Sequence, residues 1–491
     1  MRADRESIHS RANTGGRVYP LAALLLAAAS VLERMARNLG QTTPADVAPT
    51  VAATLAFALG VWLLAALARR RADAGAALIA AIWTIACLYY AEIFGNLDRS
   101  LGGGYPLLHA FPVALAAMGL LTWAAWRWGH LLRVVHLVLI GIGAAMLLPP
   151  VWKIAAHEWA QGDVARAHVP DAATAARTSG RDGDGHAPPA AGDSRPPDIY
   201  HFIFDRYGSE RTLADRYGID EPIGTFLESQ GFYVAREARA NYQKTGHSLA
   251  SIFAMDYLTP LAEGDYGGRN WRPIFGMLDD HAVGRFLRER GYEHHQYGSW
   301  WAGTFHNSRA DVNRPHGFSE FNMIYLRGTI LRPLFHLLPD TPLTMRLDWD
   351  NAQCQRLGPQ LEEIRSIGER DRPVYVFAHI LVPHGPYVFT PEGDCLDQRA
   401  ARARGPRQGY VDQIGYADTI MRDMVAALLS EDRAPPVIIF QADEGPFPES
   451  YGRGPWQEAP AADLAMKYGI LTAIFVPGGD HGRFRQDMTA V

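Results

Sequence analysis

The sequence has no excess of positive charge. Its 491 residues include 47 Lys and Arg against 52 Asp and Glu, which gives a formal net charge of −5. Proteins that bind nucleic acid usually present a broad basic surface, and this charge balance does not supply one. The composition therefore argues against a nucleic-acid partner, and the length suggests more than one domain.

Cysteine is also scarce, with three residues in the whole chain. Cys87 lies in an apolar run, whereas Cys354 and Cys395 lie in the second half. This spacing argues against a cysteine metal site. Cys354 and Cys395 could pair in an oxidising compartment, but a sequence does not supply the distance that a disulfide requires. A disulfide and two free thiols both remain open.

Long apolar runs are confined to the first part of the chain, although the mean hydropathy of −0.11 averages them away. Most approach the roughly 20 residues needed to cross a bilayer. We interpret them as transmembrane helices of a membrane domain, residues 1–160. No convincing cleavage site follows the first run, so a cleaved signal peptide is not expected. The five runs are 18–32, 51–68, 74–94, 110–126 and 131–152.

Arginine is distributed unevenly around these runs, and Lys and Arg favour the cytoplasmic side of a membrane. Arginines precede the first run and follow the second and the fourth, whereas the alternate loops hold fewer. The pattern predicts a cytoplasmic N-terminus and an extracytoplasmic remainder of the chain after the fifth helix. The arginines on the predicted cytoplasmic side are Arg2, Arg5, Arg11, Arg17, Arg69, Arg70, Arg71, Arg127 and Arg133.

Residues 161–197 are rich in Ala, Gly, Asp, Arg and Pro. Such a segment cannot bury enough apolar surface to offset the entropy of ordering it. We predict a flexible linker here, with the last apolar helix extending a little over 155–166.

The remaining residues, 198–491, alternate short apolar runs with helical patterns. Near-continuous apolar strands are typical of a sheet that is covered on both faces, so we predict an α/β domain with a mostly parallel sheet between helices. The apolar runs are 197–205, 373–380, 435–443 and 468–476, and the helical patterns include 223–230, 281–290 and 409–429.

Chemically capable side chains follow these predicted strands. Asp205, His384, Asp443 and Glu444 all come at or just after strand ends. Ligands of such sheets bind outside the carboxyl ends of the strands, so these side chains are expected at one edge. Carboxylates with a hydroxyl or imidazole suit a divalent cation.

Thr245 can reach the same edge from a helix. Leu249, Ile252 and Phe253 recur at helical spacing, which predicts a helix that begins near Thr245. Thr245 could simply cap this helix. Alternatively, a helix N-terminus and a metal ion would favour its ionised hydroxyl, which makes Thr245 a candidate nucleophile.

These features together resemble the membrane-anchored, sulfatase-like branch of the alkaline phosphatase superfamily, which includes lipoteichoic acid synthases and phosphoethanolamine transferases. The resemblance implies that Asp205, Thr245, Asp443 and Glu444 bind one divalent metal ion, Zn or Mn. It further implies that Thr245 is the catalytic nucleophile and that His384 faces the substrate. The motifs that carry it are Asp205 in Phe-Asp-Arg-Tyr-Gly, Thr245-Gly-His-Ser248, His384-Gly-Pro386 and Asp443-Glu444.

Lys244 and His247 flank Thr245 and are further candidates for phosphate contacts. The function implied is metal-dependent phosphoryl transfer, or phosphodiester hydrolysis, on a lipid-linked or envelope substrate. The expected location is a bacterial-type inner membrane, with the catalytic domain on the periplasmic side. A catalytically degenerate envelope binding protein and a sulfuric ester hydrolase are the alternatives. The Cys-x-Pro-x-Arg pattern of true sulfatases, or its Ser version, is absent, which disfavours the second. The oligomeric state stays open.

The chain departs from the family pattern in three places. Glu444 stands where phosphotransferases usually have His, and no further His follows soon after; His481 comes much later, in a turn-like sequence. The chain also ends soon after residue 476, where the resemblance predicts a further helix and strand, so we expect an exposed sheet edge. The pairs His294-His295 and Trp300-Trp301 are assigned to either the site rim or the core.

Overall fold

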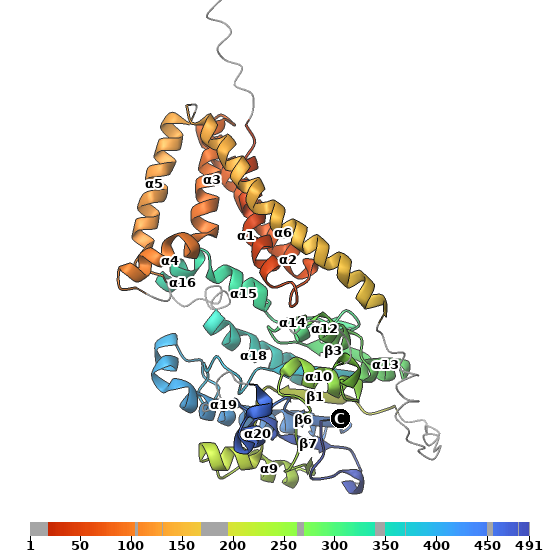
Figure 1. Ribbon diagram of the computed structural model, residues 1–491. Helices are drawn as coiled ribbons and strands as arrows, with labels where there is room; N and C mark the ends of the chain where they lie inside the picture. Colours follow the sequence, from red (N-terminus) through yellow and green to blue (C-terminus); the bar gives the residue numbers. More distant parts are fainter. Residues whose placement is uncertain are drawn as a thin grey trace, which may run out of the picture. The chain divides into compact units, whose positions relative to one another are not determined.

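The computed structural model describes residues 18–103, 107–129, 131–167, 195–262, 270–338, 349–368, 370–448, 455–479 and 481–490 (Figure 1). The chain divides into two compact units. The first combines Met1–Ala167 with Phe321–Thr344, and the second combines His168–Glu320 with Met345–Val491. One feature of this division was not expected from the sequence: a short segment from the second half of the chain packs with the N-terminal helices.

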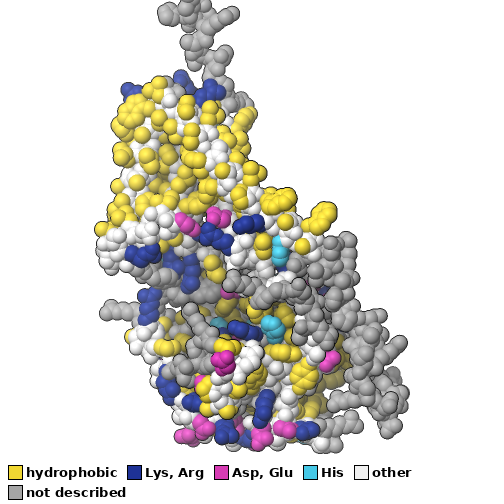
Figure 2. Space-filling view, in the orientation of Figure 1, with side chains coloured by type: hydrophobic (Ala, Val, Ile, Leu, Met, Phe, Trp, Pro, Cys, Tyr) yellow, Lys and Arg dark blue, Asp and Glu magenta, His cyan; other side chains and the backbone are white. Residues whose placement is uncertain are grey.

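All five apolar runs of the first unit form helices, and hydrophobic side chains cover their outer surface (Figure 2). By length and composition, two described helices can cross a membrane, α2 and the Arg133–Ala160 part of α6, or three if the bent pair α3–α4 is one span. Five spans therefore remain a prediction. The helices are α1 (Leu21–Arg37), α2 (Pro44–Arg69), α3 (Ala74–Leu88), α4 (Tyr90–Ser100), α5 (Phe111–Trp128) and α6 (Arg133–Ala167).

Helix α6 continues to Ala167, so the first seven residues of the expected linker are helical instead. This agrees with the predicted extension of the last apolar helix over 155–166. Most of the expected linker, 168–194, lies outside the described residues.

The inserted segment carries α15 (Glu320–Arg327) and α16 (Leu331–Leu337). Tyr325 Oη lies 2.8 Å from Ser30 Oγ of α1. Gly328 C=O accepts from Ala91 N at 3.0 Å, and Ile330 N donates to Cys87 C=O at 2.8 Å. These two bonds satisfy backbone groups that the break between α3 and α4 would otherwise leave unpaired. The segment is thus an integral part of the first unit.

The second unit is built on a seven-stranded sheet in the order β2-β7-β6-β1-β5-β3-β4. The central strands are parallel, and β7 is antiparallel to β6 and β2. The predicted fold class is confirmed, and β1, β5, β6 and β7 fall within the four apolar runs. The strands are β1 (Ile199–Phe204), β2 (Tyr233–Val234), β3 (Glu293–Tyr297), β4 (Val312–Asn313), β5 (Val374–Ile380), β6 (Val437–Gln441) and β7 (Thr472–Phe475).

The expected exposed edge at β7 is wrong, because β2 pairs with its far side. β2 is only two residues long and carries no apolar run, so the sequence did not indicate it.

Both faces of the sheet are covered. Phe202 and Phe204 of β1 join Phe440 of β6 in one core cluster, while Ile203 of β1 packs with Phe377 in another. Successive strand residues point to opposite faces, so this alternation places helices on both sides. The helices and short turns are α8 (Glu210–Thr212), η1 (Leu213–Tyr217), α9 (Ile223–Ser229), α10 (Thr245–Ala254), α11 (Thr259–Ala262), α12 (Arg272–Asp279), α13 (Ala282–Glu289), α14 (Ala302–Phe305), α18 (Trp349–Arg365), α19 (Gln398–Leu428), η2 (Trp456–Glu458), α20 (Ala461–Tyr468) and η3 (His481–Arg483).

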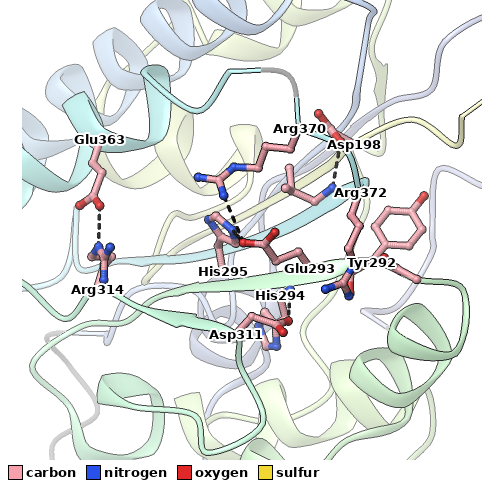
Figure 3. Close-up of polar contacts among 12 residues, drawn as sticks. Asp198, Tyr292, Glu293, His294, His295, Asp311, Arg314, Glu363, Arg370 and Arg372 are labelled. Carbon is pink, nitrogen blue, oxygen red and sulfur yellow. Dashed lines mark hydrogen bonds and ion pairs between the residues drawn. The ribbon is translucent and has the colours of Figure 1, made fainter.

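Strand β3 is polar yet buried, and some of its polar groups bond to neighbouring residues (Figure 3). His295 Nε2 lies 2.7 Å from Glu293 Oε1, and Arg370 donates to the same oxygen at 3.2 Å. His294 N donates to Asp311 Oδ2 at 2.8 Å. Hydropathy therefore missed this strand, and the His294-His295 pair belongs to the core.

Cys354 on α18 forms a disulfide with Cys395, with a Cα–Cα distance of 5.8 Å. The pairing that the sequence left open is thus formed. Cys87 is a buried free thiol.

Candidate active site

Parallel pairing brings the predicted acidic residues together. Strand β1 pairs with both β5 and β6, so the loops that follow these strands emerge at one edge. Asp205 follows β1, and Asp443 and Glu444 follow β6. One carboxylate oxygen from each of the three lies within 4.8 Å of the other two.

These three carboxylates are almost fully buried, at 0–2% exposure. Among the described residues, Asp205 Oδ1, Asp443 Oδ2 and Glu444 Oε2 have no hydrogen-bond partner. Buried carboxylate oxygens are normally bonded, and converging ones repel each other. The arrangement fits a divalent cation, because a cation would satisfy all three oxygens at once.

Thr245 is the first residue of α10, and Lys244 occupies the N-cap position. No side chain caps the helix, and the Thr245 hydroxyl lies close enough to the Asp443 carboxylate to lower the pKa of that group. Ser248, one turn later, donates from Oγ to Asp443 C=O at 2.6 Å. The two contacts fix the start of α10 against the loop after β6.

Gly246 allows this close approach. A Cβ at that position would lie 2.7 Å from the Trp271 ring and 3.1 Å from the Trp301 ring. Trp301 also lies with its ring centroid 6.3 Å from that of His379. Trp301 is partly buried against the core cluster that includes Leu249 and Phe253, and the small residue after Thr245 is required for this packing.

Two cations face the acidic cluster. Lys467 Nζ, fully buried on α20, lies 2.8 Å from Glu444 Oε1 and donates to Gly445 C=O at 2.9 Å. Arg206 Nε donates to the same Glu444 oxygen at 3.2 Å, and Arg206 N donates to Asp443 Oδ1 at 3.2 Å. Two cations hold Glu444 Oε1, which leaves its other oxygen turned to the cluster.

The pKa values follow from burial and these neighbours. Burial and the carboxylates of Asp205 and Glu444 raise the pKa of Asp443 well above its usual value. Burial would also raise the pKa of Asp205, but His384, His379 and Arg206 outweigh it and lower that pKa. Asp205 thus favours its charged form and Asp443 its protonated form, as expected for like charges in one buried cluster.

Two histidines follow or end strand β5. His379 Nε2 lies 3.3 Å from Asp205 Oδ2, and its Nδ1 contacts Thr304 Oγ1 at 2.8 Å. His384 lies with its ring centroid 6.1 Å from that of Trp300, and burial lowers its pKa to about 4. Its Nδ1 contacts Gly385 C=O. Because a carbonyl only accepts, Nδ1 carries the proton and Nε2 is left as an acceptor.

The residues that flank Thr245 differ in position. Lys244 Nζ lies 5.9 Å from the centroid of the Phe447 ring, which also packs against Arg206 and Lys467. His247 packs against Trp271, and burial together with Lys244 lowers its pKa. Lys244 is therefore one of three cations around Phe447, with Arg206 and Lys467, near the carboxylate cluster. His247 instead packs against an aromatic ring.

Sequence reasoning missed His379 and Lys467. His379 precedes the His-x-Pro motif inside an apolar strand, where a core role is the ordinary interpretation. Lys467 is one lysine on a short amphipathic helix, and no motif marks it. His481 packs its ring 5.9 Å from that of Tyr233, in η3 beyond β7, and is not one of the residues that surround the cluster.

The second unit is an α/β domain. At the ends of its strands, buried carboxylates face a hydroxyl group at the N-terminus of a helix. Residues 227–469 match the protein-family model described as Sulfatase. This match, which lies within the range expected for the catalytic domain, agrees with the sulfatase-like resemblance of the sequence. A comparison with curated proteins found no match.

Several solved structures are similar at low identity. The integral membrane lipooligosaccharide phosphoethanolamine transferase A from Neisseria meningitidis is 15% identical with a TM-score of 0.32, over 94% of this chain and 88% of that chain. Its soluble domain is 15% identical with a TM-score of 0.35, over 59% and 78%. The phosphonate monoester hydrolase of Agrobacterium radiobacter is 16% identical with a TM-score of 0.37, over 60% and 71%.

Proposed function

We propose that this chain is a membrane-bound, metal-dependent enzyme that transfers or hydrolyses a phosphodiester group through Thr245. The observation that carries the proposal is the set of three buried carboxylate oxygens without a hydrogen bond to any described residue, close to the Thr245 hydroxyl. A site that merely stabilised the fold would not keep three such oxygens unpaired.

Asp205, Asp443, Glu444 and Thr245 would hold one divalent ion, Zn or Mn. All four offer oxygen, and a carboxylate-rich donor set suits Mn better than a set with imidazole would. We therefore favour Mn. When bound, such an ion would lower the pKa of the threonine hydroxyl and offset negative charge on the phosphodiester.

The protein groups then divide the chemistry. Thr245 Oγ forms a bond to phosphorus while the bond to the leaving oxygen breaks, which gives a phosphothreonine ester, and the proton lost by the threonine hydroxyl passes to the departing alcohol. An incoming hydroxyl, from water or an acceptor, displaces the threonine and restores its hydroxyl. His384 is neutral near pH 7 with Nε2 unprotonated, so it suits the role of proton acceptor for this incoming hydroxyl. Arg206, Lys244 and Lys467 supply positive charge for the non-reacting phosphate oxygens.

A lipid-linked or envelope substrate follows from the membrane helices, because tethering raises the effective concentration of the enzyme at the membrane surface. The disulfide between Cys354 and Cys395 and the arginine distribution both support an extracytoplasmic second unit in a bacterial-type inner membrane. Phosphoryl rather than sulfuryl chemistry is favoured, because the nucleophile position is Thr and the Cys-x-Pro-x-Arg pattern is absent.

The reaction class is tested with the full-length protein in detergent and Mn²⁺. Chromogenic phosphodiester, phosphomonoester and sulfate-ester substrates would be compared with phosphatidylethanolamine and phosphatidylglycerol in mixed micelles. We expect turnover of phosphodiesters and lipids above that of the sulfate ester. Preferred cleavage of the sulfate ester would overturn the phosphoryl assignment, and binding of lipid without any turnover would favour a degenerate binding protein.

A further inference from the structure

A second buried charge lies at the same edge of the sheet and forms no ion pair with any described residue. Arg356, on α18, is only 4% exposed. Its Nη2 donates to Phe318 C=O at 2.7 Å, but Nε and Nη1 have no hydrogen-bond partner. Within the part of the chain that the structure describes, no carboxylate forms an ion pair with it. A buried, unpaired guanidinium is costly, so its retention calls for an explanation.

Helix α18 places Arg356 close to the ends of the central strands. Gln353, Arg356 and Gln360 lie on one helix face because they are spaced by three and four residues. Gln353 Nε2 donates to Leu381 C=O, just after β5, at 3.4 Å. Gln360 Nε2 donates to Tyr297 C=O, at the end of β3, at 2.9 Å. Arg356 therefore lies between two contacts with the strand ends that also carry His384 and Trp300.

The loop that contacts Arg356 is continuous with the candidate active site. A Cβ at Gly317 would lie 3.1 Å from Arg356 Nη2, so glycine leaves room beside the guanidinium. Ser319, two residues later, is 7% exposed and its Oγ has no partner among the described residues. Glu320 N then donates to Trp300 C=O at 2.8 Å, and Trp300 packs near His384.

The acid available on the same helix is already engaged. Glu363, two turns beyond Arg356, pairs with Arg314 at 2.6 Å (Figure 3). It also lies 2.7 Å from His316 Nε2. The region therefore holds a cation with two unused donors and a hydroxyl. Of its two nearby acids, Glu363 is already engaged, and burial raises the pKa of Glu320, next to Ser319, to about 7, which favours its neutral form near neutral pH. Charge-assisted bonds from a guanidinium are strongest to phosphate and carboxylate groups.

We propose that Arg356, with Ser319, forms an anion subsite that binds a phosphate-type oxyanion beside the candidate active site. If the proposed function holds, the ligand is a second anionic group of the donor or acceptor, distinct from the phosphodiester that reacts at Thr245. The subsite then selects doubly anionic substrates. Anion binding itself does not depend on the proposed reaction.

The test uses full-length protein in detergent, with EDTA present so that metal-dependent phosphate binding at the carboxylate cluster does not contribute. Inorganic phosphate is titrated at constant ionic strength, by calorimetry and by thermal unfolding of wild type, Arg356→Met, Arg356→Lys and Arg314→Met. Arg314 is the matched control, because it is a half-exposed arginine already paired with Glu363.

We expect saturable phosphate binding and a rising melting temperature in wild type and in Arg314→Met. Arg356→Met should lose both, yet melt at or above the wild-type temperature without phosphate, because it removes an unpaired buried charge. Arg356→Lys should bind phosphate at least tenfold more weakly. Absence of saturable binding in wild type, or unchanged binding in Arg356→Met, would overturn the proposal.

Failure of this proposal can be told apart from failure of the proposed function. Thr245→Ala should keep the phosphate response and lose turnover. Arg356→Met should keep Mn²⁺ binding and raise KM for a lipid with an extra phosphate more than for a simple chromogenic diester. Equal KM changes for both substrates would contradict the link to the substrate while leaving anion binding in place.

Discussion

Two buried charged regions at one sheet edge contrast in sign. The cluster of Asp205, Asp443 and Glu444 gathers three carboxylates against the two cations Arg206 and Lys467. The region around Arg356 has one cation and, among the described residues, no carboxylate paired with it. Charges out of water are tolerated only when they are compensated. The first region is therefore arranged for a cation and the second for an anion, and the experiments below either break or sharpen this contrast.

The largest expected effect is on turnover by Thr245→Ala. Removal of the nucleophile of a covalent mechanism should lower kcat by at least about 10³-fold. Release of the leaving group from a chromogenic phosphodiester measures it. Thr245→Ser, which keeps a hydroxyl, should retain part of the activity. A variant that keeps more than a tenth of the wild-type rate would remove Thr245 from the reaction.

Next comes Lys467→Met, which leaves Glu444 with one cation fewer in a buried setting. Breaking a buried ion pair typically costs roughly 3–5 kcal/mol, and we expect a loss of that order in the metal-free protein. Urea unfolding of the full chain, followed by the fluorescence of tryptophans in the second unit, measures it. The double variant Lys467→Met, Glu444→Gln should recover most of the loss. No recovery would mean that Lys467 acts through packing alone.

Metal binding should stabilise the acidic region and leave the Arg356 region unaffected. At a Mn²⁺ concentration of about 100 times Kd, the gain is about 2.7 kcal/mol. Thermal unfolding after EDTA treatment and Mn²⁺ addition tests this, with Asp443→Asn expected to lose most of the gain. Glu444→His should shift the preference from Mn²⁺ towards Zn²⁺, since imidazole suits Zn²⁺. A ratio of Zn²⁺ to Mn²⁺ affinity that does not rise in Glu444→His relative to wild type would contradict the assignment of Glu444 as a metal ligand.

The smallest effect concerns a carboxylate outside both regions. Asp418 accepts from Tyr207 Oη at 2.5 Å, and burial raises its pKa from 3.8 to about 7. The folded state holds this proton more tightly than the unfolded state does, so stability falls as pH rises from about 4 to about 7. The free energy of unfolding of Asp418→Asn, relative to that of wild type, should therefore be about 1–3 kcal/mol higher at pH 8 than at pH 4.5. Denaturant unfolding at pH 4.5 and pH 8, with and without Mn²⁺, measures this difference. A gain that depended on Mn²⁺ would place Asp418 within the metal site.

Sequence patterns predicted the parts of the fold that rest on local signals. Apolar runs marked β1, β5, β6 and β7, and helical spacing placed the start of α10 at Thr245. The apolar pattern did not predict strand β3, because His294 and His295 are polar residues. Their burial depends on partners elsewhere in the chain, such as Asp311, which accepts a hydrogen bond from His294 N. Hydropathy cannot register a partner that lies elsewhere in the chain.

The same limit applies to the site. Asp205, Asp443 and Glu444 were predictable because each follows a strand, and strand ends converge in a parallel sheet. Lys467 and Arg356 were not, because their significance lies in what surrounds them: one is paired with Glu444, and the other lacks an ion-pair partner among the described residues. Packing between remote segments creates both conditions, and neither leaves a motif.

The central claim is that Thr245 becomes covalently phosphorylated during the reaction. The most direct measurement is the intact mass of full-length protein in detergent, quenched in acid after incubation with Mn²⁺ and phospholipid, with the modified peptide mapped. We predict a phosphoryl-containing adduct on Thr245 of the wild type that is absent from Thr245→Ala. An adduct at another residue, or active turnover with no adduct under conditions that slow its breakdown, would contradict the account.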